Sequence, residues 1–324
     1  MTYKIDQCVW NYKHCLLNSS KLIKRKRKKQ FYENYIDLFY KNNFKSKFCK
    51  KCKCNVNQNW FNENETFKIY NNIYPQHHRG WKNFNRIFSL NEKKNILKIV
   101  EIQKRLSAKS IAEFNCPFSG LFLNYYLEMY SKVTSKRLIN KAKKLLKINQ
   151  LANFKTKKKL DSAFKNFKHT YAEFKNLKEE KKDFKELYFF NDNSTNSWNY
   201  GCISEGVNCR SLSSLLFDYT YVNFYPNFKK KINLDLFIFA DTLDHSQNPS
   251  AILNYALRNS KYVIIIANAE KNVTNQHRFS LSQSFKVFFG EKFNVKKIFF
   301  DKKKKEIAYV VSKYSLNIIK DLCI

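Results

Sequence analysis

Residues Asp235–Pro249 read DLFIFADTLDHSQNP, and this stretch decides the fold class. Five consecutive apolar residues follow Asp235. A short continuous apolar run between polar residues is typical of a strand that is buried on both faces, as in a parallel sheet. Pro249 suits the first turn of a helix, because its missing N–H is not needed there. The stretch therefore predicts a strand, a polar loop and a helix, in that order.

The segments on both sides of this stretch continue the alternation of strands and helices. Tyr262–Ala267 reads YVIIIA, another continuous apolar run, and Pro249–Arg258 has the length of a helix. The order predicts an α/β fold, namely a Rossmann-like, doubly wound, mostly parallel sheet with a terminal antiparallel hairpin. The remaining strands are expected at 110–116, 186–190, 219–224, 295–301 and 306–312, and the remaining helices at 91–105, 121–130, 209–217 and 281–289.

The α/β domain is expected to span residues 91–313. Residues 1–90 form a small, basic, cysteine-containing N-terminal appendage, and residues 314–324 form a C-terminal tail. Residues 132–185 are rich in Lys, Leu and Phe and nearly free of helix breakers, so they predict a helical insertion that is longer than an ordinary loop. The first helix of the domain is expected to bury a stripe made of Ile96, Leu97, Val100 and Ile102.

The composition limits the classes of protein and partner. The chain has 324 residues, of which 17% are aromatic, and this aromatic content excludes a disordered basic tail. No apolar run is long enough to span a membrane and no signal peptide is evident, so a cytoplasmic location is expected. The net charge of +35 attracts nucleic acid and anionic molecules. Because most of the basic residues are Lys rather than Arg, nucleic acid is an alternative partner and not the favoured one.

Residues Ala112–Gly120 read AEFNCPFSG and lie between an expected strand and an expected helix. A Rossmann-type fold places the loop that meets a nucleotide cofactor at this point. Together with Asp235–Pro249, this segment resembles the motifs of class I S-adenosylmethionine-dependent methyltransferases. The resemblance implies that Glu113 is the acid of the first motif and that the loop passes the methionine moiety of S-adenosylmethionine. The loop residues concerned are Asn115, which stands where the first glycine of the motif is expected, and Cys116, Ser119 and Gly120. An ordinary strand-to-helix turn is the alternative.

The same resemblance implies further site residues. Asp241 and Thr242 follow the strand whose carboxyl end meets the cofactor, and His245 becomes a substrate-facing group or general base. Asp192 ends the second strand, where an acid holds both ribose hydroxyls. His277, in the segment NQHRFS, is a candidate substrate contact. The alternatives are a helix-cap histidine at position 245 and plain turn chemistry around Asp192.

Two clusters in the N-terminal appendage carry reactive side chains. Cys49, Cys52 and Cys54 form a C-x2-C-x-C pattern that favours zinc in a reducing compartment. The order of cysteine cluster and α/β domain resembles sugar C-methyltransferases that carry an N-terminal zinc domain. Buried thiols are the alternative. His77 and His78 lie in an aromatic segment that ends at Trp81; they are candidates for a base or substrate ligand above the active site, and a structural turn is the alternative.

The expected function is methyl transfer from S-adenosylmethionine to a small-molecule acceptor, such as a sugar or nucleotide-sugar. One alternative is an RNA or other nucleic-acid methyltransferase, which the net charge of +35 and the basic 132–185 segment favour. The other is a non-catalytic protein that keeps the methyltransferase fold, which Asn115 in the cofactor loop favours.

Overall fold

The structure is a computed structural model. It describes residues 2–4, 46–49, 52–57, 59–62, 90–114, 186–192, 220–224, 231–246, 249–269, 277–285, 293–303 and 305–324. The expected cofactor loop, the helices 121–130 and 209–217, and the insertion 132–185 lie outside these residues.

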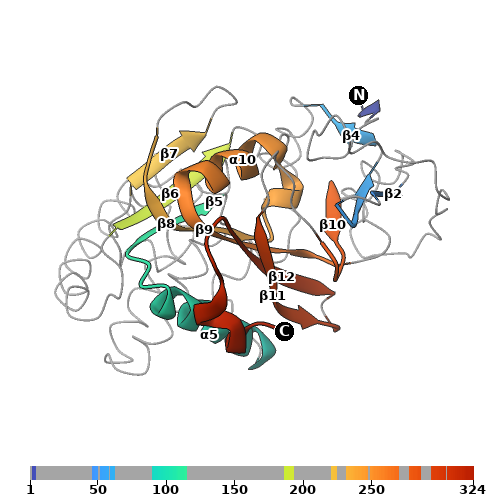
Figure 1. Cartoon of the computed structure of the whole chain (residues 1–324). Helices are drawn as coiled ribbons and strands as arrows, with labels where there is room; N and C mark the ends of the chain where they lie inside the picture. The colour runs from blue at the N-terminus through green and yellow to red at the C-terminus, as the bar shows by residue number, and fades with distance from the viewer. Residues whose placement is uncertain are drawn as a thin grey trace, which may run out of the picture.

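A seven-stranded sheet forms the centre of the molecule (Figure 1). Its strands are β5 (Ser110–Phe114), β6 (Glu186–Asp192), β7 (Thr220–Phe224), β8 (Leu234–Ala240), β9 (Ser260–Asn268), β11 (Asn294–Asp301) and β12 (Glu306–Ser312). The spatial order is β7-β6-β5-β8-β9-β12-β11. The pairs from β7 to β9 are parallel, and β12 is antiparallel to both β9 and β11. The predicted mostly parallel sheet with a terminal hairpin is confirmed.

The strand order creates a switch point between β5 and β8. From β5 the chain moves outward through β6 to β7, and it then returns to place β8 on the other side of β5. In open α/β sheets, ligands bind at the carboxyl ends of the strands on either side of such a point. The carboxyl ends of β5 and β8 are Phe114 and Ala240, so this edge is the expected place of a functional site.

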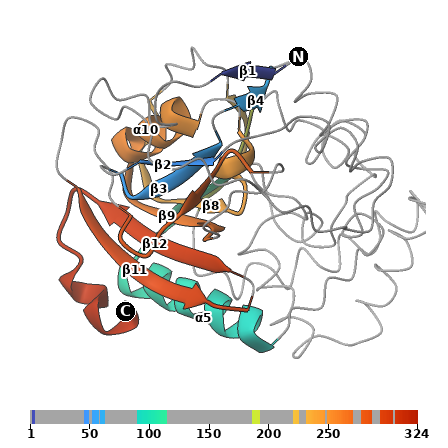
Figure 2. The same cartoon turned by 90° about the vertical axis from the view of Figure 1, so that its right-hand side faces the viewer.

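Helices cover both faces of the sheet (Figures 1 and 2). Helix α10 (Pro249–Asn259) lies on one face, and α5 (Leu90–Arg105) lies on the other together with the short 3-10 helix η5 (Asn317–Leu322). Helix α5 buries Ile96, Val100 and Ile102 as expected, but Leu97 is 50% exposed. Ile99 takes the place of Leu97 on the buried face of the helix, because an α-helix has 3.6 residues per turn and position 97 points outward. None of the described helices is long and apolar enough to cross a bilayer.

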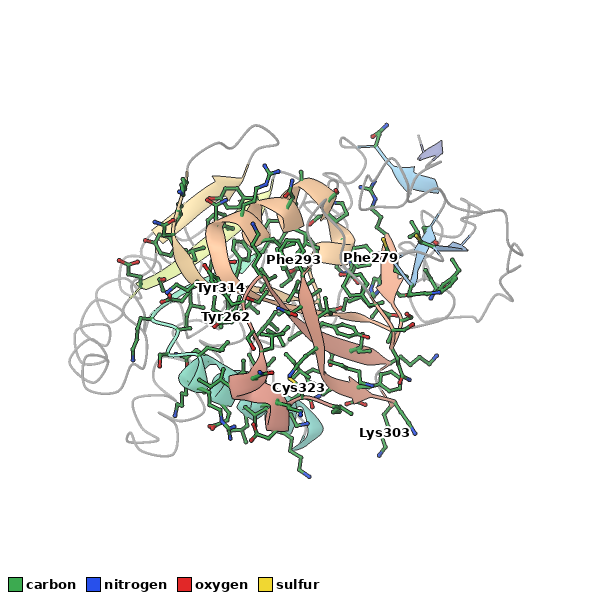
Figure 3. The ribbon with its side chains drawn as sticks, in the orientation of Figure 1. Tyr262, Phe279, Phe293, Lys303, Tyr314 and Cys323 are labelled. Atoms are coloured by element: carbon green, nitrogen blue, oxygen red, sulfur yellow. The ribbon has the colours of Figure 1, made fainter. Side chains whose placement is uncertain are left out.

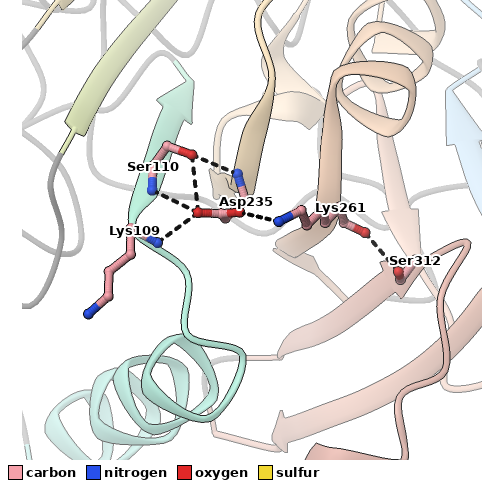
Figure 4. Close-up of polar contacts among 5 residues, drawn as sticks. All are labelled: Lys109, Ser110, Asp235, Lys261 and Ser312. Carbon is pink, nitrogen blue, oxygen red and sulfur yellow. Dashed lines mark hydrogen bonds and ion pairs between the residues drawn. The ribbon is translucent and has the colours of Figure 1, made fainter.

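The amino ends of the central strands are fastened by one carboxylate, Asp235 (Figure 4). Its Oδ2 accepts hydrogen bonds from the main-chain N–H groups of Lys109 and Ser110, at 2.9 and 3.1 Å. Its Oδ1 lies 2.8 Å from Nζ of Lys261, and Ser312 Oγ donates to the main-chain oxygen of Lys261 at 2.7 Å. Asp235 therefore stabilises the amino edge of the sheet, opposite to the carboxyl edge where a ligand site is expected.

The N-terminal cysteine segment is part of a second, three-stranded sheet. Strands β2 (Ser46–Cys49) and β3 (Cys54–Asn57) form an antiparallel hairpin, and β10 (Phe279–Leu281) pairs with β3. The side chain of Phe279 is fully buried and belongs to the same core cluster as the cysteines and the central sheet (Figure 3). Close by, β1 (Thr2–Lys4) pairs with β4 (Asn59–Phe61).

The helix predicted at 281–289 is wrong at its start. Leu281 is the last residue of β10, and the main-chain N–H of Phe285 donates to the oxygen of Ser282 in a turn. Pairing with β3 fixes Phe279–Leu281 as a strand, and such tertiary pairing overrides a local helical pattern.

Candidate functional site

The residues after β8 tie the carboxyl edge of the sheet together. Asp241 takes a left-handed conformation with φ of 55°, and its N–H donates to the oxygen of Ile266 at 2.9 Å. The side chain of Thr242 is buried, and its hydroxyl donates to the main-chain oxygen of Phe114 at 2.8 Å. This bond joins the ends of β5 and β8 at the switch point. Asp241 itself is exposed beside it.

A short 3-10 helix, η4 (Leu243–His245), then turns the chain inward. The N–H of His245 donates to the oxygen of Thr242 at 3.2 Å, which tightens the turn. Asp244 is fully buried and His245 is 4% exposed. An acid and an imidazole are therefore held under the carboxyl edge, although neither is an apolar residue.

His277 completes the group from a distant part of the chain. Its Nδ1 lies 3.3 Å from Oδ2 of Asp244, and its ring meets the ring of His245 edge to face, with centroids 4.7 Å apart. The N–H of the next residue, Arg278, donates to the main-chain oxygen of Asp244 at 2.7 Å. Two segments are thus joined side chain to side chain and main chain to main chain.

The Asp244 carboxylate is the unusual group in this site. Both of its oxygens are buried, and the 3.3 Å contact with Nδ1 of His277 falls short of a well-formed hydrogen bond. Burial raises the pKa of Asp244 well above its ordinary value, and the negative charge of Asp241 adds to the rise, while the main-chain N–H groups of Asp244 and Asn268 oppose it. A buried carboxylate with so few donors is costly unless it gains a proton or a cation.

Asp244, His245 and His277 could hold a metal ion. One possible ligand atom from each of the three residues lies within 4.8 Å of those of the other two. Among the described residues, this is the group of His, Cys, Asp or Glu side chains that has a spacing suited to a metal ion. Two imidazoles and one carboxylate suit a divalent transition-metal ion. The buried oxygens of Asp244 fit such an ion, because coordination would add to the weak contacts that they already make.

The three cysteines occupy a different setting. Cys49, Cys52 and Cys54 are fully buried in the core, and the N–H of Cys52 donates to Sγ of Cys49 at 3.5 Å. They do not appear as a group with metal-ligand spacing within the described ranges. Zinc binding by these cysteines stays a prediction.

The other expected site residues fall into two groups. Glu113 is fully buried one residue before the end of β5, and Asp192 is the last residue of β6, so both lie toward the carboxyl edge. The rest lie outside the described residues: His77, His78, Asn115, Cys116, Ser119 and Gly120.

The sequence interpretation missed Asp244 as a site residue. Its position beside His245 in the Asp235–Pro249 stretch was the available signal. The sequence interpretation also missed the contacts of His277, because no sequence pattern shows which distant segment of the chain lies beside this residue.

No protein-family model matches the chain, and no curated protein sequence does either. Solved structures resemble it at low identity. The methyltransferase domain of bacterial CtHen1 is 13% identical, with 69% of this chain and 100% of that chain covered and a TM-score of 0.36. The N-terminal domain of EvdMO1, determined in the presence of SAH and D-fucose, is 9% identical, with 69% and 83% covered and a TM-score of 0.32. The 16S rRNA methylase ArmA is 12% identical, with 79% and 100% covered and a TM-score of 0.29. At these values, the fold assignment rests on the strand order of this chain.

Proposed function

We propose that this protein transfers a methyl group from S-adenosylmethionine to a hydroxyl group of a small molecule, with a sugar or nucleotide-sugar as the acceptor class. The observation that carries the proposal is the trio of Asp244, His245 and His277, which lies next to the switch point of a Rossmann-like sheet. Ligand sites of such sheets lie at this edge.

The cofactor would be held along the carboxyl edge. S-adenosylmethionine supplies a sulfonium methyl group that a nucleophile takes in one in-line displacement. Asp192, at the end of β6, is the residue we assign to the ribose hydroxyls, because a carboxylate accepts two hydroxyl hydrogen bonds. Glu113 and the exposed Asp241 lie at the ends of the two strands that flank the switch point. The hydrogen bond from Thr242 to Phe114, here called the latch, keeps these ends at a fixed separation.

The acceptor would be held by the trio. Asp244, His245 and His277 would hold a divalent cation, which would supply Lewis-acid chemistry toward the acceptor hydroxyl. Asp244 supplies the negative charge, and His245 and His277 supply neutral nitrogen ligands from two segments that main-chain bonds hold together. A bound cation would offset the buried charge of Asp244, and the acceptor would take a position that is fixed relative to the carboxyl edge of the sheet.

Calorimetric titration tests both parts of the proposal separately. We expect the purified protein to bind S-adenosylmethionine and its product S-adenosylhomocysteine one to one, and to bind Mn²⁺. Asp244→Asn keeps the shape of the side chain, and we expect it to weaken Mn²⁺ binding by at least about 100-fold, because the charged ligand is lost. Asp235→Asn is the matched control, since it removes the same charge from the opposite end of the sheet.

Each outcome has a definite meaning. Binding of neither cofactor form by a folded sample would contradict methyl transfer and favour a non-catalytic protein. Cofactor binding without Mn²⁺ binding would contradict only the role of the cation and leave Asp244 and His277 as a proton-holding pair.

A nucleic-acid acceptor is the second candidate. The net charge of +35 supports it, because a basic surface attracts the phosphate backbone.

A further inference from the structure

The end of strand β3 lies directly against the main chain of His277. The N–H of Asn57 donates to the oxygen of Arg278 at 2.9 Å, and its side-chain Nδ2 donates to the oxygen of His277 at 2.5 Å. Asn57 is fully buried, although an amide side chain is polar. The two residues joined by the side-chain bond are 220 positions apart in the chain.

The next contact along this path reaches the trio. The N–H of Arg278 donates to the main-chain oxygen of Asp244, at 2.7 Å. The main chain at 277–278 is therefore held between Asn57 on one side and Asp244 on the other. This leaves the imidazole of His277 directed at Oδ2 of Asp244, 3.3 Å away.

We propose that Asn57 is the positioning residue of His277, and hence that the N-terminal hairpin β2–β3 is a part of the acceptor site. This inference rests on the proposed function for the meaning of the trio. Hydrogen bonds behind a metal ligand fix its orientation, and their loss typically weakens metal binding by 10- to 100-fold. Here the bond acts on the main chain of the ligand residue, since its acceptor is the carbonyl oxygen of His277.

Two substitutions remove the side-chain donor and keep the main-chain bond. Asn57→Ala deletes the amide, and Asn57→Asp keeps its shape but directs an oxygen at the carbonyl of His277. Asn55→Ala is the matched control. Asn55 lies on the same strand, and its Nδ2 is 3.5 Å from Oγ of Ser280, which is outside the trio. All variants are compared in the full chain, with circular dichroism to verify that each is folded.

We expect both Asn57 variants to bind Mn²⁺ at least about tenfold more weakly than the wild type. The Asn55→Ala variant should stay within about twofold, because its contact does not touch a ligand residue. Mn²⁺ affinity that is unchanged in the folded Asn57 variants would overturn the proposal.

A second readout does not require the metal. The chain has six histidines, so the ring signals of His277 can be identified by NMR through a His277→Gln variant. In metal-free protein we expect Asn57→Ala to shift the ring signals of His277 and of His245, which touches it edge to face. Asn55→Ala should leave both unchanged. If the wild type binds no Mn²⁺, the role of the cation fails while this comparison still decides the role of Asn57. If the ring signals of His277 do not move in Asn57→Ala, the proposed role of Asn57 is overturned.

Discussion

At the scale of single residues, the carboxyl edge of the sheet and the turn that follows β8 hold buried polar side chains. Thr242 shows this directly, because its hydroxyl is fully buried and donates to the main-chain oxygen of Phe114. Asp244 shows the opposite case, because the contact with His277 only weakly satisfies its buried carboxylate. Thr242 fastens the strand ends at the switch point, and Asp244 is a buried acid close to it in the chain.

Replacing Thr242 with Val should loosen this edge without changing the side-chain shape. The oxygen of Phe114 would be left buried without its donor, which costs about 1–3 kcal/mol. Urea unfolding should show a lower midpoint with the slope unchanged. Ser246→Ala is the control, because the Ser246 hydroxyl reaches only 3.4 Å from the oxygen of Thr242 and joins no two strands. Equal stability of Thr242→Val and the wild type would show that the latch contributes nothing.

At the scale of elements, the parallel strands are fastened at both ends by different residues. Thr242 joins β5 and β8 at the carboxyl edge, and Asp235 joins β5, β8 and β9 at the amino edge (Figure 4). Ser312 extends the amino-edge network to β12 through the main chain of Lys261. The bond of Thr242 and the network of Asp235 thus lie at opposite edges of the sheet, so each can be altered without the other.

Asp235 should make stability depend on acid pH. Burial acts to raise the pKa of Asp235, but the hydrogen bonds from Lys261 and from the N–H groups of Lys109 and Ser110 outweigh it and hold the pKa below the ordinary value. The stability that this carboxylate contributes is therefore present above its unfolded pKa of about 4 and is lost as the pH falls through the folded value.

The measurement is thermal unfolding of the wild type and Asp235→Asn at several pH values. We expect the variant to be less stable at pH 7, since it cannot pair with Lys261, and the difference to shrink below about pH 4. A difference that stays constant down to about pH 2 would contradict the role of the ionised carboxylate.

At the scale of the whole molecule, the net charge of +35 leads to different expectations for RNA binding under the two acceptor classes. If the acceptor is a small molecule, we expect RNA binding to fall steeply with salt and to be no tighter than binding to a lysine-rich protein of similar charge. Methyl transfer to small hydroxyl compounds should then be unaffected by added RNA. Two results together would favour the nucleic-acid acceptor. The protein would bind RNA much more tightly than the control does at about 150 mM salt, and Asp244→Asn would abolish RNA methylation without weakening RNA binding.

Much of the central sheet could be predicted from the sequence because its signals are local. The apolar runs in Asp235–Ala240 and Tyr262–Ala267 match strands β8 and β9, and the strands expected at 295–301 and 306–312 form the terminal hairpin of β11 and β12. A buried parallel strand needs apolar side chains on both faces, so a continuous apolar run predicts such a strand without reference to the rest of the chain. The helix at 91–105 was found in the same way, apart from the direction of Leu97.

The sequence by itself determined the strands of the central sheet and their order along the chain, and it marked His245 and His277 as candidates. Only the tertiary structure decided that Phe279–Leu281 is a strand, that Asp244 is buried against His277, and that Asn57 lies behind this histidine. The physical reason is the range of the interactions. Strand and helix patterns arise between near neighbours, whereas β3, β10 and η4 meet through hydrogen bonds between segments that are far apart in the chain and leave no periodic trace in it.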